Sequence, residues 1–237
     1  KVEKFDIVIK KGYIIDGTGN PWFKADIGID KGRIKKIGLI KEKGQKTIDA
    51  KGMIVSPGFI DLHNHTDFTI LAYPNCESNI MQGITTAVVG NCGLSMAPVN
   101  PKNLELLREY LSPFLPEGFN YEWDWKTLKE YYEKVKEKRF SMNLAPLVGQ
   151  GTIRIAVKGF ERSKPSREEM NEMKKLLSKS LEDGAFGMST GLIYPPGCYA
   201  TTEELIELGE VLKEYGRIYA THIRTEGNKL IRAVEEA

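Results

Sequence analysis

Residues 57–67 have the sequence Pro57-Gly-Phe-Ile-Asp-Leu-His-Asn-His-Thr-Asp67, and this stretch decides the fold class. Its first half is the short apolar run Phe59–His63, which predicts a strand. Side chains two residues apart on a strand point the same way, so His63 and His65 project together from the strand's carboxyl end. Two neighbouring imidazoles suit a divalent transition metal. The alternative for a lone His-x-His is a surface pair at a strand end.

After this stretch, apolar strands alternate with amphipathic helices. Further strands are predicted at Ile84–Val89, Met142–Val148, Ala185–Ser189 and Ile218–His222, and helices at about 101–111, 124–138, 166–182, 202–215 and from 225 onward. Ser166 and Thr202 are the expected N-caps of two of these helices. The alternation indicates an α/β fold with a parallel sheet covered on both faces. It predicts a partial TIM-like (β/α)8 barrel with about five of the eight units.

An open five-stranded sheet is the alternative architecture. However, no Gly-x-Gly-x-x-Gly motif follows a strand, so the usual mark of a dinucleotide-binding fold is missing.

Residues 1–56 are expected to be the N-terminal part of a small β-sandwich-type domain, and residues 57–237 the first part of the barrel. Four apolar runs precede the barrel: Phe5–Ile9, Tyr13–Ile15, Ile27–Ile29 and Ile34–Ile37. Between them lie Lys11-Gly12, Gly17–Pro21 and Lys31-Gly32, which are typical of hairpin turns. The pattern favours a β layer over a parallel sheet.

The composition is that of a globular protein without a strong charge bias. Of 237 residues, 41% are hydrophobic and the net charge is +2, so nucleic acid is not an expected partner. No apolar run reaches about 18 residues, which argues against a transmembrane helix. The three widely spaced cysteines form no disulfide framework, and we expect a cytoplasmic protein. The 25 Lys and 23 Glu against three Gln are typical of heat-adapted proteins.

Two further residues join the histidine pair as candidate metal ligands. Cys92 follows the strand Ile84–Val89 between Gly90 and Gly93, and a thiolate is a strong zinc ligand. The alternative is a small buried apolar residue. His222, the third and last histidine, ends the strand Ile218–His222. Alone it is more typical of a structural histidine, but in a barrel it emerges at the same rim as the other two. The other cysteines, Cys76 and Cys198, are expected to be ordinary thiols.

Five separated motifs, PGFIDLHNH, QGITTAVVGNCG, APLVGQGTIR, GAFGMSTGLIYPPG and YATHIRTEG, resemble N-acyl-D-amino-acid deacylases (D-aminoacylases) of the amidohydrolase superfamily. The resemblance extends from Phe5 to the end of the chain. It implies a zinc-dependent enzyme that hydrolyses the amide bond of a small-molecule N-acyl-D-amino acid, with neither nucleic acid nor membrane as partner.

The resemblance also implies a role for each metal candidate. His63 and His65 would hold a weaker, second metal position. His222 would bind the tightly held zinc. Cys92 would be a metal-bound thiolate in the place of the carboxylated lysine of urease-like relatives.

Other residues are assigned more loosely. Tyr194 and Arg224 are candidate substrate contacts; the alternatives are an aromatic packed on its prolines and a cation paired with a nearby Glu such as Glu226. Asp67 would orient a metal-bound histidine or serve as a helix-start acid. Gln150 stands where many relatives carry a histidine, and its neutral amide cannot shuttle a proton, although it can donate hydrogen bonds.

Members of the resembled family are about twice this length. They supply another zinc histidine, a lysine and a general-base aspartate, which would lie beyond Ala237, so we expect a further C-terminal segment or a second chain to complete the barrel. Related cyclic amidases or D-peptide hydrolases are the alternative activities. Relatives of that branch often use a carboxylated lysine on the fourth barrel strand, and Ala185–Thr190 contains no lysine. A catalytically inactive metal-binding fragment or subunit is the remaining alternative.

Overall fold

The computed structural model describes residues 4–237. The chain divides into two compact units, Lys1–Gly58 and Phe59–Ala237. The boundary expected from the sequence, between residues 56 and 57, lies close to this division.

The first unit is one mixed β-sheet. Its strands are β1 (Ile7–Ile14), β2 (Phe23–Asp30), β3 (Arg33–Gly38), β4 (Lys46–Asp49) and β5 (Ile54–Val55). The order across the sheet is β3-β2-β1-β4, and β5 also pairs with β1. Strands β1, β2 and β3 are antiparallel neighbours, whereas β4 and β5 run parallel to β1. The predicted β layer is therefore present, with two parallel pairings that the turn signals did not indicate.

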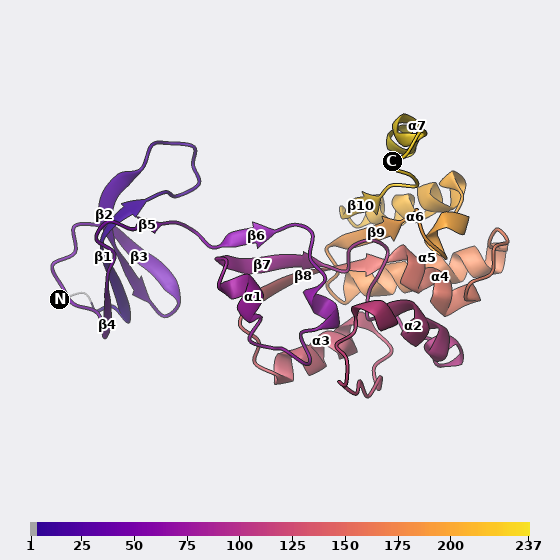
Figure 1. Ribbon diagram of the computed structural model, residues 1–237, viewed down its shortest axis with the longest axis horizontal. Coiled ribbons are helices and arrows are strands. Elements are labelled where there is room, and N and C mark those ends of the chain that lie inside the picture. The colour runs from indigo at the N-terminus through magenta and orange to yellow at the C-terminus, as the bar shows by residue number, and fades with distance from the viewer. Residues whose placement is uncertain (1–3) are drawn as a thin grey trace. The chain divides into compact units, whose positions relative to one another are not determined.

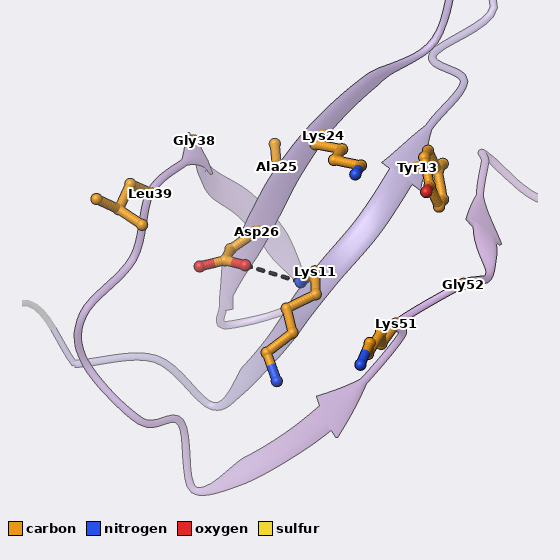
Figure 2. Close-up of a pocket in the computed structure, with 9 residues that line it drawn as sticks. All are labelled: Lys11, Tyr13, Lys24, Ala25, Asp26, Gly38, Leu39, Lys51 and Gly52. Carbon is orange, nitrogen blue, oxygen red and sulfur yellow. Dashed lines mark hydrogen bonds between the residues drawn. The ribbon is translucent and has the colours of Figure 1, made fainter.

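One of the two Lys-Gly turn predictions is confirmed and the other is wrong. Lys31 and Gly32 have φ angles of 51° and 70° and connect β2 to β3. Lys11 lies inside β1, where the register with β2 shifts, and its φ of 63° marks a bulge. Its backbone N–H donates a 2.9 Å hydrogen bond to a carboxylate oxygen of Asp26 (Figure 2). Left-handed residues occur both in bulges and in hairpin turns, so the local sequence does not separate the two.

The second unit contains a parallel sheet of five strands. These are β6 (Phe59–Asp61), β7 (Ile84–Val89), β8 (Asn143–Gly149), β9 (Gly187–Gly191) and β10 (Ile218–His222). They stand next to one another in chain order, and every neighbouring pair is parallel (Figure 1). All five predicted barrel strands are confirmed, with boundaries that move by two residues at most.

Helices connect the strands. They are α1 (Glu77–Ile80), α2 (Leu104–Leu111), α3 (Leu128–Glu137), α4 (Gln150–Lys158), α5 (Arg167–Glu182), α6 (Thr202–Glu214) and α7 (Leu230–Glu236), with the 3-10 turns η1 (Thr66–Phe68), η2 (Pro101–Asn103), η3 (Ser112–Phe114) and η4 (Gly197–Tyr199). In the described chain no helix is long and apolar enough to span a membrane.

The helix starts follow their local chemistry. Ser166 caps α5 in a capping box with Glu169, as predicted. The cap of α6 is Thr201, one residue before the prediction, because its hydroxyl accepts the backbone N–H of Glu204. Helix α4 was missed. Its sequence contains Ile-Arg-Ile-Ala-Val, and such β-branched alternation favours a strand until tertiary packing overrides it.

The core of the second unit lies between the strands and these helices. Val89, Val148 and Met188 are fully buried on consecutive strands. The two edge strands differ sharply from this core: Phe59 and Ile60 on β6 are 61% and 63% exposed, and Ile218 on β10 is 55% exposed. Apolar side chains at both edges of this sheet are therefore exposed to solvent.

Candidate metal centre

Three side chains that could bind a metal, His63, His65 and Cys92, meet beyond the carboxyl ends of β6 and β7. One donor atom from each lies within 4.8 Å of the others. The Cys92 sulfur is 3.2 Å from Nε2 of His63, and the two imidazole centroids are 5.4 Å apart. Tetrahedral zinc bound at ordinary lengths separates a sulfur and a nitrogen ligand by roughly 3.5 Å. The donor set therefore fits a shared zinc ion.

The surroundings of His65 favour the neutral form of its imidazole. Burial, followed by the neighbouring His63, lowers the pKa of His65 below its ordinary value. Its ring stacks on Phe68 at 5.6 Å and lies 5.8 Å from the Phe114 ring. Within residues 4–237, its buried Nδ1 has no hydrogen-bond partner. A neutral imidazole with an unpartnered nitrogen is the form that binds a metal.

Cys92 sits in a backbone conformation that its neighbours enforce. Its φ is 57°, in the left-handed region, and the flanking Gly90 and Gly93 both have φ of 74°. A Cβ on Gly90 would stand 2.0 Å from the carbonyl oxygen of Leu147, and one on Gly93 would stand 2.7 Å from the backbone nitrogen of Gly191. Burial raises the pKa of the Cys92 thiol. A bound cation reverses this shift, because a coordinating thiol is deprotonated.

Tyr194 connects Cys92 with His222. Its hydroxyl donates a hydrogen bond to the backbone carbonyl oxygen of Cys92. Its ring meets the His222 imidazole edge-on, with centroids 5.7 Å apart. His222 itself is not among the three side chains whose donor atoms lie within 4.8 Å of one another. Its buried Nε2 is 3.2 Å from Glu226, without hydrogen-bond geometry. The metal role of His222 and the substrate role of Tyr194 stay predictions.

Arg224 is engaged within the chain. Its Nε and Nη2 donate to the carboxylate of Glu236 at 2.8 and 2.7 Å. Its Nη1 and Nη2 also donate to the carbonyl oxygens of Cys198 and Ala200. The acid that pairs with it is thus Glu236 on α7, not the nearby Glu226. Its predicted substrate contact is untested.

Asp67 does not orient His65 through a hydrogen bond. Its Oδ1 and the His65 Nδ1 are both buried and lack partners in the described chain. Asp67 lies in the first turn of η1, in line with the helix-start alternative. Burial, opposed by the backbone N–H of Gly90, raises the Asp67 pKa to about 8.

Comparison with known proteins identifies the family. A model of the amidohydrolase family matches residues 46–226. The chain belongs to this family. Among curated relatives, it is 38% identical over 234 residues to an N-acyl-D-aspartate deacylase, covering 98% of this chain and 46% of that protein. It is 40% identical over 240 residues to an N-acyl-D-glutamate deacylase, covering 99% and 47%. Both relatives are from Alcaligenes xylosoxydans xylosoxydans.

Solved structures agree with the predicted fold of this amidohydrolase. The N-acyl-D-glutamate deacylase of Bordetella bronchiseptica, complexed with zinc and a phosphonate inhibitor, superposes with a TM-score of 0.88 at 38% identity. The match covers 99% of this chain and 48% of that structure. A D-aminoacylase structure gives 0.85 at 37% identity, covering 98% and 48%. The amidohydrolase chain thus spans about half the length of these relatives, and the partial barrel with its small additional domain is confirmed.

The structure also reveals a buried polar network that the sequence did not indicate. Gln150, at the start of α4, donates from Nε2 to Glu204 Oε1 at 2.8 Å. Arg154, one turn later, donates to Glu204 Oε2 at 2.5 Å. The Arg154 and Glu204 side chains are 0% and 1% exposed. Gln150 thus hydrogen-bonds as its amide allows. Arg154 and Glu204 look like surface charges of helices, and no local signal distinguishes them.

A cavity of ≈ 450 Å³ lies in the N-terminal unit of the amidohydrolase and is lined by Lys11, Tyr13, Lys24, Ala25, Asp26, Gly38, Leu39, Lys51 and Gly52 (Figure 2). Its one carboxylate, Asp26, accepts hydrogen bonds from the backbone N–H groups of Lys11 and Ile40. Burial raises the Asp26 pKa, but these bonds outweigh it and the net shift is downward. The Asp26 carboxylate is hydrogen-bonded, and the nine lining residues include neither histidine nor cysteine. We therefore assign no catalytic or metal-binding role to this cavity.

Proposed function

We propose that the intact protein hydrolyses the amide bond of N-acyl-D-amino acids and releases a carboxylate and a D-amino acid. The observation that carries the proposal is the convergence of His63, His65 and Cys92 at the carboxyl edge of the parallel sheet. Chemistry in barrel enzymes takes place at this edge. Support comes from the 37–40% identity to three curated deacylases that act on N-acyl-D-amino acids or are called D-aminoacylases.

The proposed cofactor is Zn²⁺, one ion tightly bound and a second, weaker position nearby. His63, His65, Cys92 and His222 would hold it. When bound, zinc polarises the scissile carbonyl and lowers the pKa of a coordinated water. The contribution of the chain itself is to keep His65 neutral, to fix the Cys92 backbone through Tyr194, and to bury the unpartnered nitrogens of His65 and His222.

We further propose that a C-terminal segment or a second chain covers the open edges of the sheet. The exposed Phe59 and Ile60 at one edge and Ile218 at the other support this, because bare strand edges with apolar side chains invite pairing. The general-base aspartate is expected in that additional part. A cytoplasmic location remains a prediction supported by three free thiols, and heat adaptation remains a prediction from composition.

The test uses the protein encoded by the complete reading frame that contains this chain. It is assayed with N-acetyl-D- and N-acetyl-L-amino acids, before and after chelation and with zinc restored. We expect turnover of the D series, loss on chelation and recovery with zinc. Cys92→Ala should abolish turnover and lower the bound zinc, whereas Cys198→Ala should retain both.

Other outcomes would assign the protein differently. Turnover that survives complete metal removal would refute the metal-dependent mechanism. Hydrolysis of cyclic amides or D-peptides in place of N-acyl-D-amino acids would move the protein to the related branch. Stoichiometric zinc with no hydrolysis of any of these substrates would indicate a noncatalytic metal-binding protein.

A further inference from the structure

The long excursion between β7 and β8 is built around the backbone that follows His65. The hydroxyl of Tyr131 donates to the carbonyl oxygen of Asp67, and the hydroxyl of Tyr121 donates to the carbonyl oxygen of Phe68. Both phenols are buried, and both carbonyls belong to η1. The excursion therefore fixes the segment that directly follows the histidine pair.

One aromatic side chain of this excursion reaches the metal-binding group itself. Phe114 lies at the end of η3, between Pro113 and Pro116 in the sequence. Its ring centroid is 5.8 Å from that of His65 and 5.4 Å from that of Phe68. Phe68 is fully buried, whereas Phe114 is 41% exposed. Of the two phenyl rings in contact with the imidazole, Phe68 belongs to the core and Phe114 presents an apolar face to solvent.

We propose that Phe114 is a specificity-determining residue that forms an apolar wall for the acyl chain of the substrate. The inference rests on the proposed function. It assigns a preference for N-acyl groups with several aliphatic carbons, because an exposed aromatic face gains free energy when it covers methylene groups.

Because Phe114 lies beside His65, we assign its ring to the acyl chain of the substrate and not to the amino-acid side chain. The metal-binding side chains mark where the scissile carbonyl carbon must bind. The acyl chain is bonded directly to that carbon, whereas the amino-acid side chain is separated from it by the amide nitrogen and the α-carbon. A ring in contact with a candidate metal-binding histidine is therefore closer to the acyl chain than to the amino-acid side chain.

The experiment compares two substrate series on the intact, zinc-loaded protein. One series carries acetyl, butanoyl and hexanoyl groups on the same D-amino acid, and the other carries acetyl on D-alanine, D-leucine and D-phenylalanine. In Phe114→Ala we expect kcat/KM for the hexanoyl substrate to fall about tenfold relative to the acetyl substrate. The ratios within the side-chain series should stay the same. Phe114→Leu, which keeps apolar bulk at the site, should retain most of the hexanoyl preference.

A matched control and a binding measurement distinguish failure of the Phe114 proposal from failure of the proposed function. Phe119→Ala removes a comparably exposed ring from the same excursion, where it contacts Tyr121 and not His65, and should leave both series unchanged. Calorimetric binding of acetate, butanoate and hexanoate should show the same loss of chain-length dependence in Phe114→Ala, even without turnover. A change confined to the side-chain series, or none in a folded variant, overturns the proposal. Absence of turnover in the wild type refutes the proposed function instead, and the carboxylate titration still tests Phe114.

Discussion

The hydroxyl of Tyr194 donates a hydrogen bond to the carbonyl oxygen of Cys92, while the Tyr194 ring lies edge-on against His222. Cys92 follows β7 and His222 ends β10, so a single side chain connects residues from strands that lie three positions apart in the sheet. The hydrogen bond contacts the Cys92 backbone where its φ is positive, a conformation that is uncommon for residues other than glycine.

Replacing Tyr194 by phenylalanine should loosen the Cys92 loop without removing the ring contact with His222. The carbonyl oxygen of Cys92 would lose its phenolic donor, and such a loss costs about 1–2 kcal/mol of unfolding free energy. Urea denaturation measures this change, and a zinc competition assay should show weaker binding. Tyr199→Phe is the control, because it also removes a tyrosine hydroxyl but keeps the ring that contacts Arg162. Unchanged stability and zinc affinity in Tyr194→Phe would contradict a positioning role.

A methyl group at Gly191 should disrupt the same junction. A Cβ there would lie 2.2 Å from the Cys92 carbonyl oxygen and 2.4 Å from the Tyr194 hydroxyl. We expect Gly191→Ala to cost about 1–3 kcal/mol, as other overpacked sites do, and to lower zinc content. Gly209→Ala is the matched control: it lies in α6 with open space around it, so alanine should stabilise the protein by about 0.5–1 kcal/mol. Thermal unfolding of the two variants should shift in opposite directions.

The buried pair of Arg154 and Glu204 predicts that substitutions of these two residues have strongly non-additive effects on the free energy of unfolding. Arg154→Met would leave the Glu204 carboxylate buried with Gln150 as its remaining side-chain donor, at a cost of about 3–5 kcal/mol. The double variant Arg154→Met/Glu204→Leu removes both charges and should recover much of that loss. Denaturant unfolding of the two single variants and the double variant gives the coupling energy. Additive effects would show that the pair does not act as a unit.

The exposed pair of Lys213 and Glu210 serves as the comparison for this cycle. Its side chains are 77% and 61% exposed, and the nitrogen-oxygen distance is 3.2 Å. Solvent screens such a pair, so Lys213→Met should change stability by less than about 1 kcal/mol.

The contact between Arg224 and Glu236 predicts an acid-sensitive attachment of α7. The hydrogen bond from Arg224 lowers the pKa of Glu236 below the ordinary value of a glutamate. A carboxylate with a lowered folded-state pKa contributes stability above its unfolded pKa, and the contribution is lost as the pH falls through the folded value. The protection factors of the α7 amides, which are corrected for the intrinsic pH dependence of amide exchange, should therefore fall as the pH drops through the lowered pKa of Glu236. Arg224→Gln should raise the Glu236 pKa in a carboxyl NMR titration; an unchanged value would contradict the assigned contact.

Several features of the fold were predictable because local sequence carries their cause. The run Ile84–Val89 forms β7 with the predicted boundaries, since six consecutive residues rich in β-branched side chains suit a buried strand. Ser166 caps α5 for an equally local reason, because its side chain accepts a hydrogen bond from the backbone N–H of Glu169 three residues later. By contrast, α4 was missed, and Lys11 was assigned to a turn although it forms a bulge in β1. Both errors concern segments whose backbone conformation is selected by neighbours distant in the sequence.

In the candidate site, too, some contacts were predictable from the sequence and others were not. The spacing of His63 and His65 and the glycines around Cys92 predicted side chains that the structure does bring together. No local signal indicates that Phe114 lies against His65 or that Glu236 binds Arg224. These partners are separated by 49 and 12 residues, and no periodic pattern relates positions on different elements.

The sequence alone determined which residues can bind a metal, where the parallel strands lie and which family the motifs resemble, because each depends on residue type and short-range spacing. Tertiary structure decided which groups meet: it brought Cys92 to the histidine pair, inserted Tyr194 between Cys92 and His222, and buried Arg154 with Glu204. The physical reason is that packing and burial depend on the relative placement of whole strands and helices, which fixes distances and pKa values only after the chain has folded.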